Sequence, residues 1–174
     1  IKELKFKPGE YFHYTNANYI LLADIIKNVS EKSFVEFLQE QIFFPLGMTN
    51  TLKYSSTNSI IKNKAIGYTE DEGKYDKTHK YSIVFNGDGQ VLTTPRDMFK
   101  WHQGIKNASI GTSDLWNKMY NKAKLNNGKT INFGLGVEFE NHNGYKGVGF
   151  DGMILGGFVS KYLYFPELDL AFFT

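Results

Sequence analysis

The chain has 174 residues, of which 41% are hydrophobic and 16% aromatic, and this composition indicates a globular domain and excludes a disordered polypeptide. The formal net charge of +2 comes from interspersed lysines and acids, and Arg96 is the one arginine, so the composition argues against nucleic acid as a partner. Cysteine is absent, which excludes disulfides and thiolate metal sites. No apolar run approaches the roughly 20 residues that a membrane-spanning helix needs.

The first part of the chain is expected to be an extended lead-in over residues 1–15, with a turn at Pro8-Gly9. A helix is predicted to follow over residues 17–29, because apolar residues recur there near helical spacing. These apolar residues are Ile20, Leu21, Ile25 and Val29.

A second helix is predicted to start after Ser33 and to continue to about Phe43. Ser33 and Glu36 match a capping box, in which the serine side chain caps the helix and the glutamate reaches back to the serine backbone. Pro45 and Gly47 then end the helix, because neither residue favours its continuation.

Residues 50–90 are rich in Asn, Ser, Thr, Gly and Lys, and they are predicted to form loops with some short strands. A third helix is expected after Thr94, which is suited to cap it, with Pro95 at the first helical position. Its amphipathic pattern consists of Met98, Phe99, Trp101, His102 and Ile105. A fourth helix is expected to begin near Thr112 or Ser113. Its apolar residues are Leu115, Trp116 and Met119, and both tryptophans are expected in the core.

After Asn127-Gly128 the composition shifts to Phe, Tyr, Val, Ile and Gly, which is typical of strands. Strands are predicted over residues 131–140, 144–150, 153–165 and 168–174, with a turn at Pro166-Glu167. Helices and loops over 1–130 followed by strands over 131–174 predict an α+β fold with an antiparallel sheet. Because the chain does not begin with Met and residues 169–174 read as an interrupted strand, residues 1–174 are expected to be a partial domain.

Five stretches, in order, resemble the serine β-lactamase and penicillin-binding-protein family, which includes class C β-lactamases, DD-peptidases and related esterases. They are a lead-in to a Tyr-x-Asn motif at 6–16, the helix that begins at 19–26, a Pro-Leu-Gly-Met element at 42–51, a Gly-rich turn into a helix at 87–97, and the closing strands over 134–174. The resemblance covers nearly the whole chain. It implies a β-lactamase/transpeptidase-like fold.

The resemblance implies an acyl-enzyme mechanism, in which a serine of a Ser-x-x-Lys motif attacks an acyl carbon. Tyr14 would then relay the proton of that serine, and Asn16 would hydrogen-bond the lysine and the substrate amide. Without the resemblance, Tyr14 would be read as a packing residue and Asn16 as a helix cap.

The family's Ser-x-x-Lys motif lies ahead of Tyr-x-Asn, so it is expected to precede residue 1. Ser59-Ile60-Ile61-Lys62 matches the pattern within the chain, but it follows Tyr14 and lies in a segment rich in Asn and Ser, without a helix cap. About one such match is expected by chance in this composition. Residues 1–174 are therefore expected to lack the nucleophile and to be inactive alone.

The family's third motif, Lys-Thr-Gly or His-x-Gly, is matched by Phe150-Asp151-Gly152, with Met153 supplying a backbone N–H to the oxyanion hole. Asp151, Gly152 and Met153 are therefore the expected substrate-binding residues. Phe150 replaces the usual His or Lys and cannot supply a positive charge. An alternative register uses His142-Asn143-Gly144, although Asn143-Gly144 also reads as a hairpin turn.

The function implied by the resemblance is hydrolysis of a β-lactam, peptide or ester, and the alternative is a non-catalytic member that binds cell-wall peptide or a protein partner. A small-molecule or peptide substrate is expected, with no cofactor and no nucleic acid. His13, His79, His102 and His142 lack tight ligand spacing, so no metal site is expected. Because family members mostly work outside the cytoplasm, an extracytoplasmic or envelope location is implied.

Overall fold

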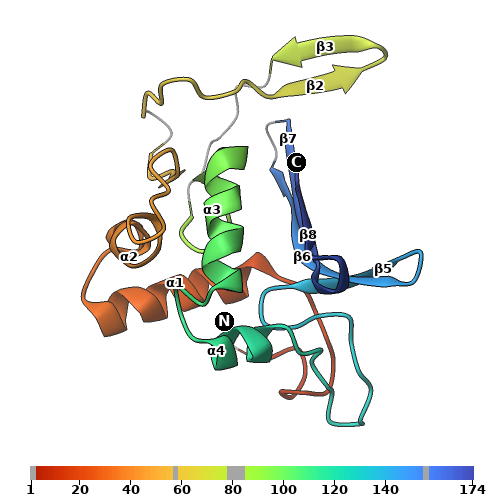
Figure 1. Cartoon of the computed structure of the whole chain (residues 1–174). Coiled ribbons are helices and arrows are strands. Elements are labelled where there is room, and N and C mark those ends of the chain that lie inside the picture. The colour runs from red at the N-terminus through yellow and green to blue at the C-terminus, as the bar shows by residue number, and fades with distance from the viewer. Residues whose placement is uncertain (1–2, 57–58, 78–84, 155–156) are drawn as a thin grey trace.

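The computed structural model of the chain describes residues 3–56, 59–77, 85–154 and 157–174. Figure 1 shows the helices on one side of an antiparallel sheet, with helix α3 (Pro95–Lys106) standing beside the sheet. A hairpin of β2 (Tyr68–Asp71) and β3 (Lys74–Lys77) projects beyond these elements. No helix within the described ranges is long and apolar enough to cross a membrane.

Helix α1 (Asn16–Ser30) confirms the predicted first helix almost to the residue. Its buried side is narrow and centres on Ala23, which is 3% exposed. Three of the four apolar residues whose spacing predicted the helix lie outside this side, since Leu21, Ile25 and Val29 are 49%, 55% and 81% exposed. The spacing therefore located the helix correctly and failed to identify its packed side, because α1 carries apolar residues on more than one side.

Helix α2 (Phe34–Leu38) begins at the predicted capping box. The Ser33 hydroxyl accepts a hydrogen bond from the Glu36 backbone N–H at 3.2 Å, and the Glu36 carboxylate accepts one from the Ser33 N–H at 3.0 Å. A π-helical segment, Gln39–Phe43, follows directly. Helical structure therefore ends at the predicted residue, but its last turn is a π-helix, which was not predicted.

Helix α3 confirms the predicted cap, because the Thr94 hydroxyl accepts a hydrogen bond from the Asp97 N–H at 3.2 Å. Helix α4 (Ser113–Met119) is capped in the same way by Thr112. The two tryptophans meet edge to face, with ring centroids 6.0 Å apart. Trp101 and Trp116 are only partly buried, and Phe99 is 57% exposed, so the predicted apolar face of α3 is correct only in part.

Four antiparallel strands form the main sheet in the order β5-β6-β7-β8. They are β5 (Glu138–His142), β6 (Tyr145–Ile154), β7 (Phe158–Phe165) and β8 (Leu170–Phe173). The first predicted strand begins too early, since residues 131–137 form only an isolated bridge from Phe133 to Glu138. The predicted last turn is confirmed as a short 3₁₀ helix, Pro166–Leu168.

Short strands that the sequence left unplaced lie in the middle of the chain. β1 (Leu52–Lys53) pairs with β4 (Val91–Leu92), just ahead of α3. This pairing brings the Pro-Leu-Gly-Met element beside the start of α3, although the two are nearly 50 residues apart.

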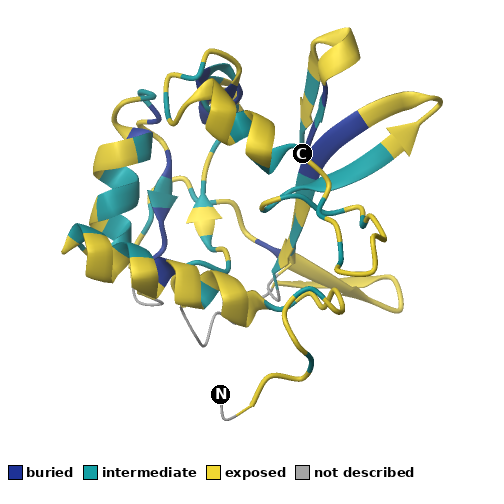
Figure 2. Cartoon of the chain, turned by 90° about the horizontal axis from the view of Figure 1, so that it is seen from below, coloured by how far each residue is buried: buried dark blue, intermediate teal, exposed yellow. Residues whose placement is uncertain are grey.

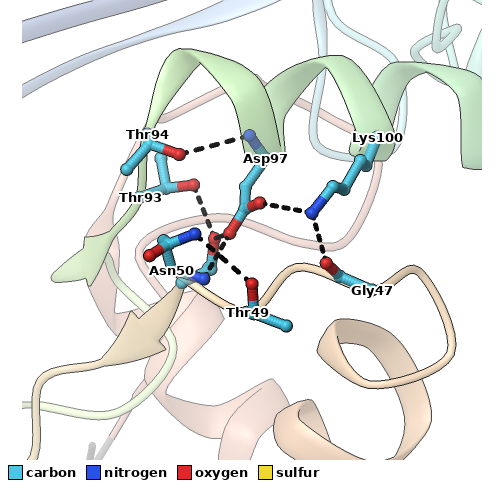
Figure 3. Close-up of polar contacts among 8 residues, drawn as sticks. Gly47, Thr49, Asn50, Thr93, Thr94, Asp97 and Lys100 are labelled. Carbon is cyan, nitrogen blue, oxygen red and sulfur yellow. Dashed lines mark hydrogen bonds and ion pairs between the residues drawn. The ribbon is translucent and has the colours of Figure 1, made fainter.

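The start of α3 is held by the Asp97 cluster, which we define as Asp97 with its partners Asn50, Thr51 and Lys100 (Figure 3). Asp97 is fully buried. Its carboxylate accepts hydrogen bonds from the Asn50 N–H at 2.7 Å, the Thr51 hydroxyl at 3.0 Å and the Lys100 ammonium at 2.9 Å. Lys100 also donates to the Gly47 carbonyl, so one carboxylate joins the loop at 47–51 to α3.

Burial is uneven over the molecule, as Figure 2 shows. His102 and Ile105 of α3 are buried, as are Val148, Leu163 and Phe165 of the sheet. By contrast, much of α1 and parts of the sheet are exposed (Figure 2). Several large hydrophobic residues are among the exposed ones.

Candidate active site

Tyr14 lies just ahead of α1 and faces strand β6. Its ring centroid is 6.1 Å from that of Phe150, with the two planes 26° apart. Its side chain is 49% exposed, so the ring is packed on one side and open to solvent on the other. The Tyr-x-Asn segment and the strand that carries the third matched motif therefore meet in the structure.

Asn16 is the first residue of α1 and is exposed. The cap of the helix is Thr15, whose hydroxyl accepts a hydrogen bond from the Ala17 N–H at 3.3 Å. The interpretation of Asn16 as the helix cap is therefore wrong, because Thr15 caps the helix. Tyr14 and Asn16 flank the cap and are fixed by the same helix start.

The lead-in to Tyr14 is tied to a turn more than 100 residues away. The Asn126 side-chain amide donates to the Pro8 carbonyl at 3.0 Å, and the Asn126 N–H donates to the Gly9 carbonyl at 2.9 Å. Gly9 has a φ of 81°, and a Cβ at this position would overlap the Asn126 side chain. Glycine is thus required both by the backbone conformation and by the close approach of Asn126.

The Gly-rich turn at 87–89 supports α1 directly behind the Tyr-x-Asn segment. Gly87 has a φ of 99°, and a Cβ there would overlap the backbone carbonyl of Tyr19. The turn therefore packs on α1, which explains its glycine without any phosphate-binding role. Burial, together with the neighbouring Tyr14, raises the pKa of the Tyr19 hydroxyl above its usual value.

The expected substrate-binding residues Asp151, Gly152 and Met153 all lie on β6. β5 pairs with β6 only up to Gly149, so within the described residues the far edge of β6 has no strand partner after that point. Successive side chains of a strand point to opposite faces, so Asp151 faces away from Phe150. Its carboxylate pairs there with Lys161 at 3.3 Å.

Four rings from three separate stretches of the chain come together around Tyr14, and we call them the aromatic cluster: Phe12, Tyr14, Phe133 and Phe150. Phe133 lies between the others, with its ring centroid 4.6 Å from Phe12, 6.3 Å from Tyr14 and 6.3 Å from Phe150. Neither Phe12 nor Phe133 was predicted from the sequence as a site residue. The available signal was the position of Phe133 directly before the matched Gly134-Leu135-Gly136.

The alternative third motif lies elsewhere in the sheet. His142 ends β5, and Asn143-Gly144 forms the hairpin turn before β6. The His142 ring lies 2.6 Å from the Glu140 carboxylate and packs against Phe165 at a centroid distance of 5.8 Å. Tyr14 therefore packs on the Phe150 register and has no ring contact with His142 among the described residues.

Ser59-Ile60-Ile61-Lys62 lies in an irregular segment, not on a helix. Ser59 is exposed, and Ile60 is 100% exposed. The lysine would need a helical turn to lie beside the serine, because residues three and four apart meet on one helix face. The segment therefore lacks the arrangement that a Ser-x-x-Lys nucleophile requires.

The histidines are spread over the structure. His13 is exposed, and His79 lies outside the described residues. His102 is 6% exposed and its Nδ1 lies 3.0 Å from the Tyr162 hydroxyl, between α3 and the sheet. No group of three His, Asp or Glu side chains that could hold a metal occurs in the described part of the chain.

His102 has the environment of a core residue. Its ring lies 4.7 Å from that of Tyr164 and 6.4 Å from that of Phe173. Burial lowers the pKa of His102 and the nearby Lys106 lowers it further, while Asp169 opposes this shift. Burial also raises the pKa of the Tyr162 hydroxyl, so burial disfavours the charged form of both groups.

The chain is similar in sequence to penicillin-binding proteins and D-aminopeptidases. Penicillin-binding protein 4* of Bacillus subtilis (strain 168) is 30% identical over 148 residues, which are 78% of this chain and 33% of that protein. A D-aminopeptidase of Brucella anthropi is 28% identical over 156 residues, which are 90% of this chain and 30% of that protein. The chain thus spans about a third of the length of these curated relatives.

Solved structures share the fold. The octameric penicillin-binding protein homologue from Pyrococcus abyssi matches with a TM-score of 0.79 and 29% identity, over 95% of this chain and 38% of that chain. The predicted α+β, β-lactamase/transpeptidase-like fold is therefore confirmed. The family model described as Beta-lactamase matches residues 2–174. With nearly every residue covered by that model, the chain belongs to the β-lactamase family of serine hydrolases and penicillin-binding proteins.

Proposed function

We propose that this chain is the part of an acyl-enzyme serine hydrolase that presents Tyr14 and Asn16 to the reacting serine. The observation that carries the proposal is the contact of Tyr14 with Phe150, 6.1 Å between ring centroids. This contact joins the Tyr-x-Asn segment to the strand on which the third motif of the family is matched. The proposal places the serine and its Ser-x-x-Lys motif outside residues 1–174.

In this mechanism the serine oxygen attacks an acyl carbon, and its proton passes by way of the Tyr14 oxygen to the amine or alcohol that leaves as the acyl-enzyme ester forms. Water then hydrolyses this ester, releases the acid product and restores the serine hydroxyl. The Asn16 side-chain amide would bind the lysine of the nucleophile motif and the amide of the substrate. The Met153 N–H would donate to the developing oxyanion, beside Asp151 and Gly152 on the open edge of β6. A substrate chain lying along that edge could pair with the strand backbone.

The names of the relatives support a substrate with an acyl carbon, because they include a penicillin-binding protein and a D-aminopeptidase. We therefore assign a β-lactam, peptide or ester as the substrate class. The same relatives support an extracytoplasmic or envelope location. No cofactor takes part in this chemistry, since the serine, the tyrosine and backbone groups supply every step.

The test is a pH–rate profile of ester hydrolysis in a protein that joins this chain to the nucleophile segment. Tyr14→Phe should lower the acylation rate about 10²–10⁴-fold, because it removes the proton relay. Tyr11→Phe is the matched control, since Tyr11 is 67% exposed and packs on Phe6 instead of β6. A parental rate in Tyr14→Phe would contradict the proposed role.

The second part of the test uses a substitution of Phe150. It supplies no positive charge beside the phenol, so acylation is expected to be fastest at alkaline pH. Phe150→His should raise the rate and move the optimum toward neutral pH. If this substitution has no effect while Tyr14→Phe does, the register is wrong and His142 becomes the residue to test.

The chain of 174 residues, tested alone, should not hydrolyse a chromogenic cephalosporin or a p-nitrophenyl ester. Mass spectrometry after incubation with a labelled penicillin should show no adduct, because the Ser-x-x-Lys match at Ser59 does not lie on a helix. A stoichiometric adduct on Ser59 would overturn this expectation.

A non-catalytic member that binds cell-wall peptide or a protein partner is the second candidate function. The observation that favours it is Phe150, because a phenyl ring cannot perform the electrostatic role of His or Lys. The two candidate functions predict different sequences ahead of Tyr14 in the whole protein. A Ser-x-x-Lys motif ahead of Tyr14 supports the hydrolase, and its absence supports the binding protein.

A further inference from the structure

Tyr14 lies in a stretch of chain that has no regular structure of its own. Residues 11–15, all of which the structure describes, belong to neither a helix nor a strand. The cap at Thr15 fixes the chain after Tyr14, because it bonds the first turn of α1. The lead-in before Tyr14 therefore needs partners from elsewhere in the molecule if the tyrosine is to keep one position.

These partners come from one segment, residues 123–133, which we call the clamp segment. It turns back on itself, and the Ala123 N–H donates to the Phe133 carbonyl at 2.7 Å. Beside this bond, the Lys122 ammonium donates to the Asn132 side-chain oxygen at 2.7 Å. The two arms of the clamp segment are thus joined where they begin and end, so the segment is held together by its own contacts.

The clamp segment holds the lead-in at two separate points. At its turn, Asn126 donates from its side chain and from its backbone to two successive carbonyls of the lead-in, at 3.0 Å and 2.9 Å. At its end, the ring of Phe133 packs against Phe12 at a centroid distance of 4.6 Å and against Tyr14 at 6.3 Å. The first contact fixes the start of the lead-in, and the second supports its end.

The two contacts differ in what they can specify. Burial of apolar rings is non-directional, so the contact at Phe133 lets the lead-in shift along its surface. Hydrogen bonds require a short distance and a nearly straight angle, so the bonds of Asn126 define the path of the backbone. Asn126 therefore supplies the directional part of the support for Tyr14.

We propose that Asn126 is a positioning residue of the candidate active site, which acts through Tyr14 by fixing the path of the lead-in. This inference rests on the proposed function, in which Tyr14 relays the proton of the serine. Proton transfer needs the two heavy atoms within about 2.6–3.2 Å of each other, and a misplacement of about 1 Å can lower a rate about 10²-fold. A side chain that holds the relay in place can therefore control the rate without touching the substrate.

The first test is Asn126→Asp in a protein that joins this chain to the nucleophile segment. The substitution keeps the size and the backbone N–H, but its carboxylate cannot donate to the Pro8 carbonyl. In single-turnover measurements the acylation rate at saturating ester should fall about two- to tenfold, the scale of one hydrogen bond, while ester binding stays unchanged. A parental acylation rate would overturn the proposal.

The matched control is Asn127→Asp, the same change at the next residue. The Asn127 side-chain oxygen accepts a hydrogen bond from the Lys129 N–H at 2.9 Å, and a carboxylate can accept this bond equally well. This variant should acylate at the parental rate. An equal loss in both variants would show that the added charge, and not the bond to Pro8, lowers the rate.

A double-mutant cycle separates positioning from a general effect on the fold. In the Tyr14→Phe background, Asn126→Asp should lower the residual acylation rate no further, because the group that it positions has been removed. A residue that only stabilises the protein would lower the rate by the same factor in both backgrounds. That outcome would reduce Asn126 to a structural role.

The same contact can be disturbed from the lead-in. In Gly9→Ala the added Cβ would overlap the Asn126 side chain, so this variant should acylate more slowly, as Asn126→Asp does. Gly73→Ala is the control for backbone strain, because Gly73 has a φ of 78°, close to the 81° of Gly9, and no described atom lies within 4 Å of an added Cβ. A parental rate in Gly9→Ala, or an equal loss in Gly73→Ala, would count against the clamp.

NMR of the 174-residue chain tests the clamp without any serine. The ring resonances of Tyr14 are assigned from their absence in Tyr14→Phe. Asn126→Asp should move them toward those of an unstructured tyrosine, because the ring loses its fixed place beside Phe133 and Phe150. Asn127→Asp should leave them in place, and unmoved resonances in Asn126→Asp would contradict the proposal.

These results distinguish failure of this inference from failure of the proposed function. If Tyr14→Phe lowers acylation as expected while Asn126→Asp acylates at the parental rate, the proposed function stands and the inference fails. If Asn126→Asp moves the Tyr14 resonances while Tyr14→Phe acylates at the parental rate, the proposed function fails, and Asn126 fixes a tyrosine that is not the relay.

Discussion

Helices α1 and α3 use their surfaces in opposite ways. α3 buries polar groups, because Asp97 and His102 are 0% and 6% exposed. α1 exposes apolar groups, since Leu21, Ile25 and Val29 remain 49% or more exposed. The difference teaches that hydrophobic spacing locates a helix, whereas the partners available to each side chain decide which face is packed.

The two helices also differ in what fixes them. Asp97 finds three hydrogen-bond donors from two segments, so burial of its charge is matched by specific partners. α1 is fixed mainly at its buried Ala23 and at its capped start, where Tyr14 and Asn16 lie. Large apolar surfaces left open in this way are typical of sites that contact another part of a protein or a partner.

The largest expected effect is at Asp97. Asp97→Ala should destabilise the fold by about 3–5 kcal/mol, because it leaves the partners of a buried carboxylate without their acceptor. The measurement is the free energy of unfolding from urea titration. Asp114→Ala is the control, because its ion pair with Lys118 is exposed and should contribute under about 1 kcal/mol. A loss at Asp97 as small as that of the control would show that α3 is not held by this residue.

The second effect concerns Trp101. Trp101→Ala should cost about 2 kcal/mol, which is less than the roughly 3–5 kcal/mol of a fully buried aromatic side chain, because Trp101 is only partly buried against Trp116. Phe99→Ala on the exposed side of the same helix should cost under about 1 kcal/mol. Equal losses in the two variants would mean that the buried face of α3 is misassigned.

The third effect depends on pH and on His102. Because burial lowers its pKa in the folded state, the unfolded chain binds more protons as the pH falls below the ordinary histidine pKa of about 6.5. His102 should therefore make the fold lose stability from pH 7 downward. In His102→Phe the unfolding free energy should fall less between pH 7 and pH 5. His13→Phe, at an exposed position, is the control, and an unchanged slope in His102→Phe would refute the assignment.

The smallest effect is expected on α1. Val29 is 81% exposed, so Val29→Ala should change stability by no more than about 0.5 kcal/mol, in the stabilising direction, because alanine favours the helix more than valine does. Urea titration is again the measurement. A loss above about 1 kcal/mol would show that this side of α1 is packed in solution, and the contrast with α3 would disappear.

Local signals explain what the sequence could predict of this fold. The caps at Ser33, Thr94 and Thr112 each bond a backbone N–H three residues later, so the sequence alone is enough to predict them. The beginning of β5 was misplaced because the ladder starts only after Gly134 and Gly136, and the latter has a φ of 80°. The hairpin β2–β3 falls among the short strands expected within residues 50–90, but it could not be placed, because every one of its strand residues is exposed and no alternation marks it.

The candidate site was also predicted only in part. The resemblance indicated Tyr14 and Phe150 as members of one site, and the structure places their rings in contact. Phe133 was not predicted, because its neighbours in space, Phe12 and Phe150, are distant in the sequence. Its position before Gly134-Leu135-Gly136 was the local signal. The amphipathic pattern of the third helix already included His102, whereas its partner Tyr162 was hidden because it lies 60 residues later in the chain.

The bond between Asn126 and the lead-in also sets the order in which the site can be completed. The Asn126 side chain reaches the Pro8 carbonyl across a separation of 118 residues. At a synthesis rate of about 5–20 residues per second, about 6–24 s pass between the addition of these two residues to the chain. During this interval α1, α2, α3 and α4 are all synthesised while the segment before Tyr14 lacks its anchor. The segment before Tyr14 is therefore made well before Asn126 can fix it.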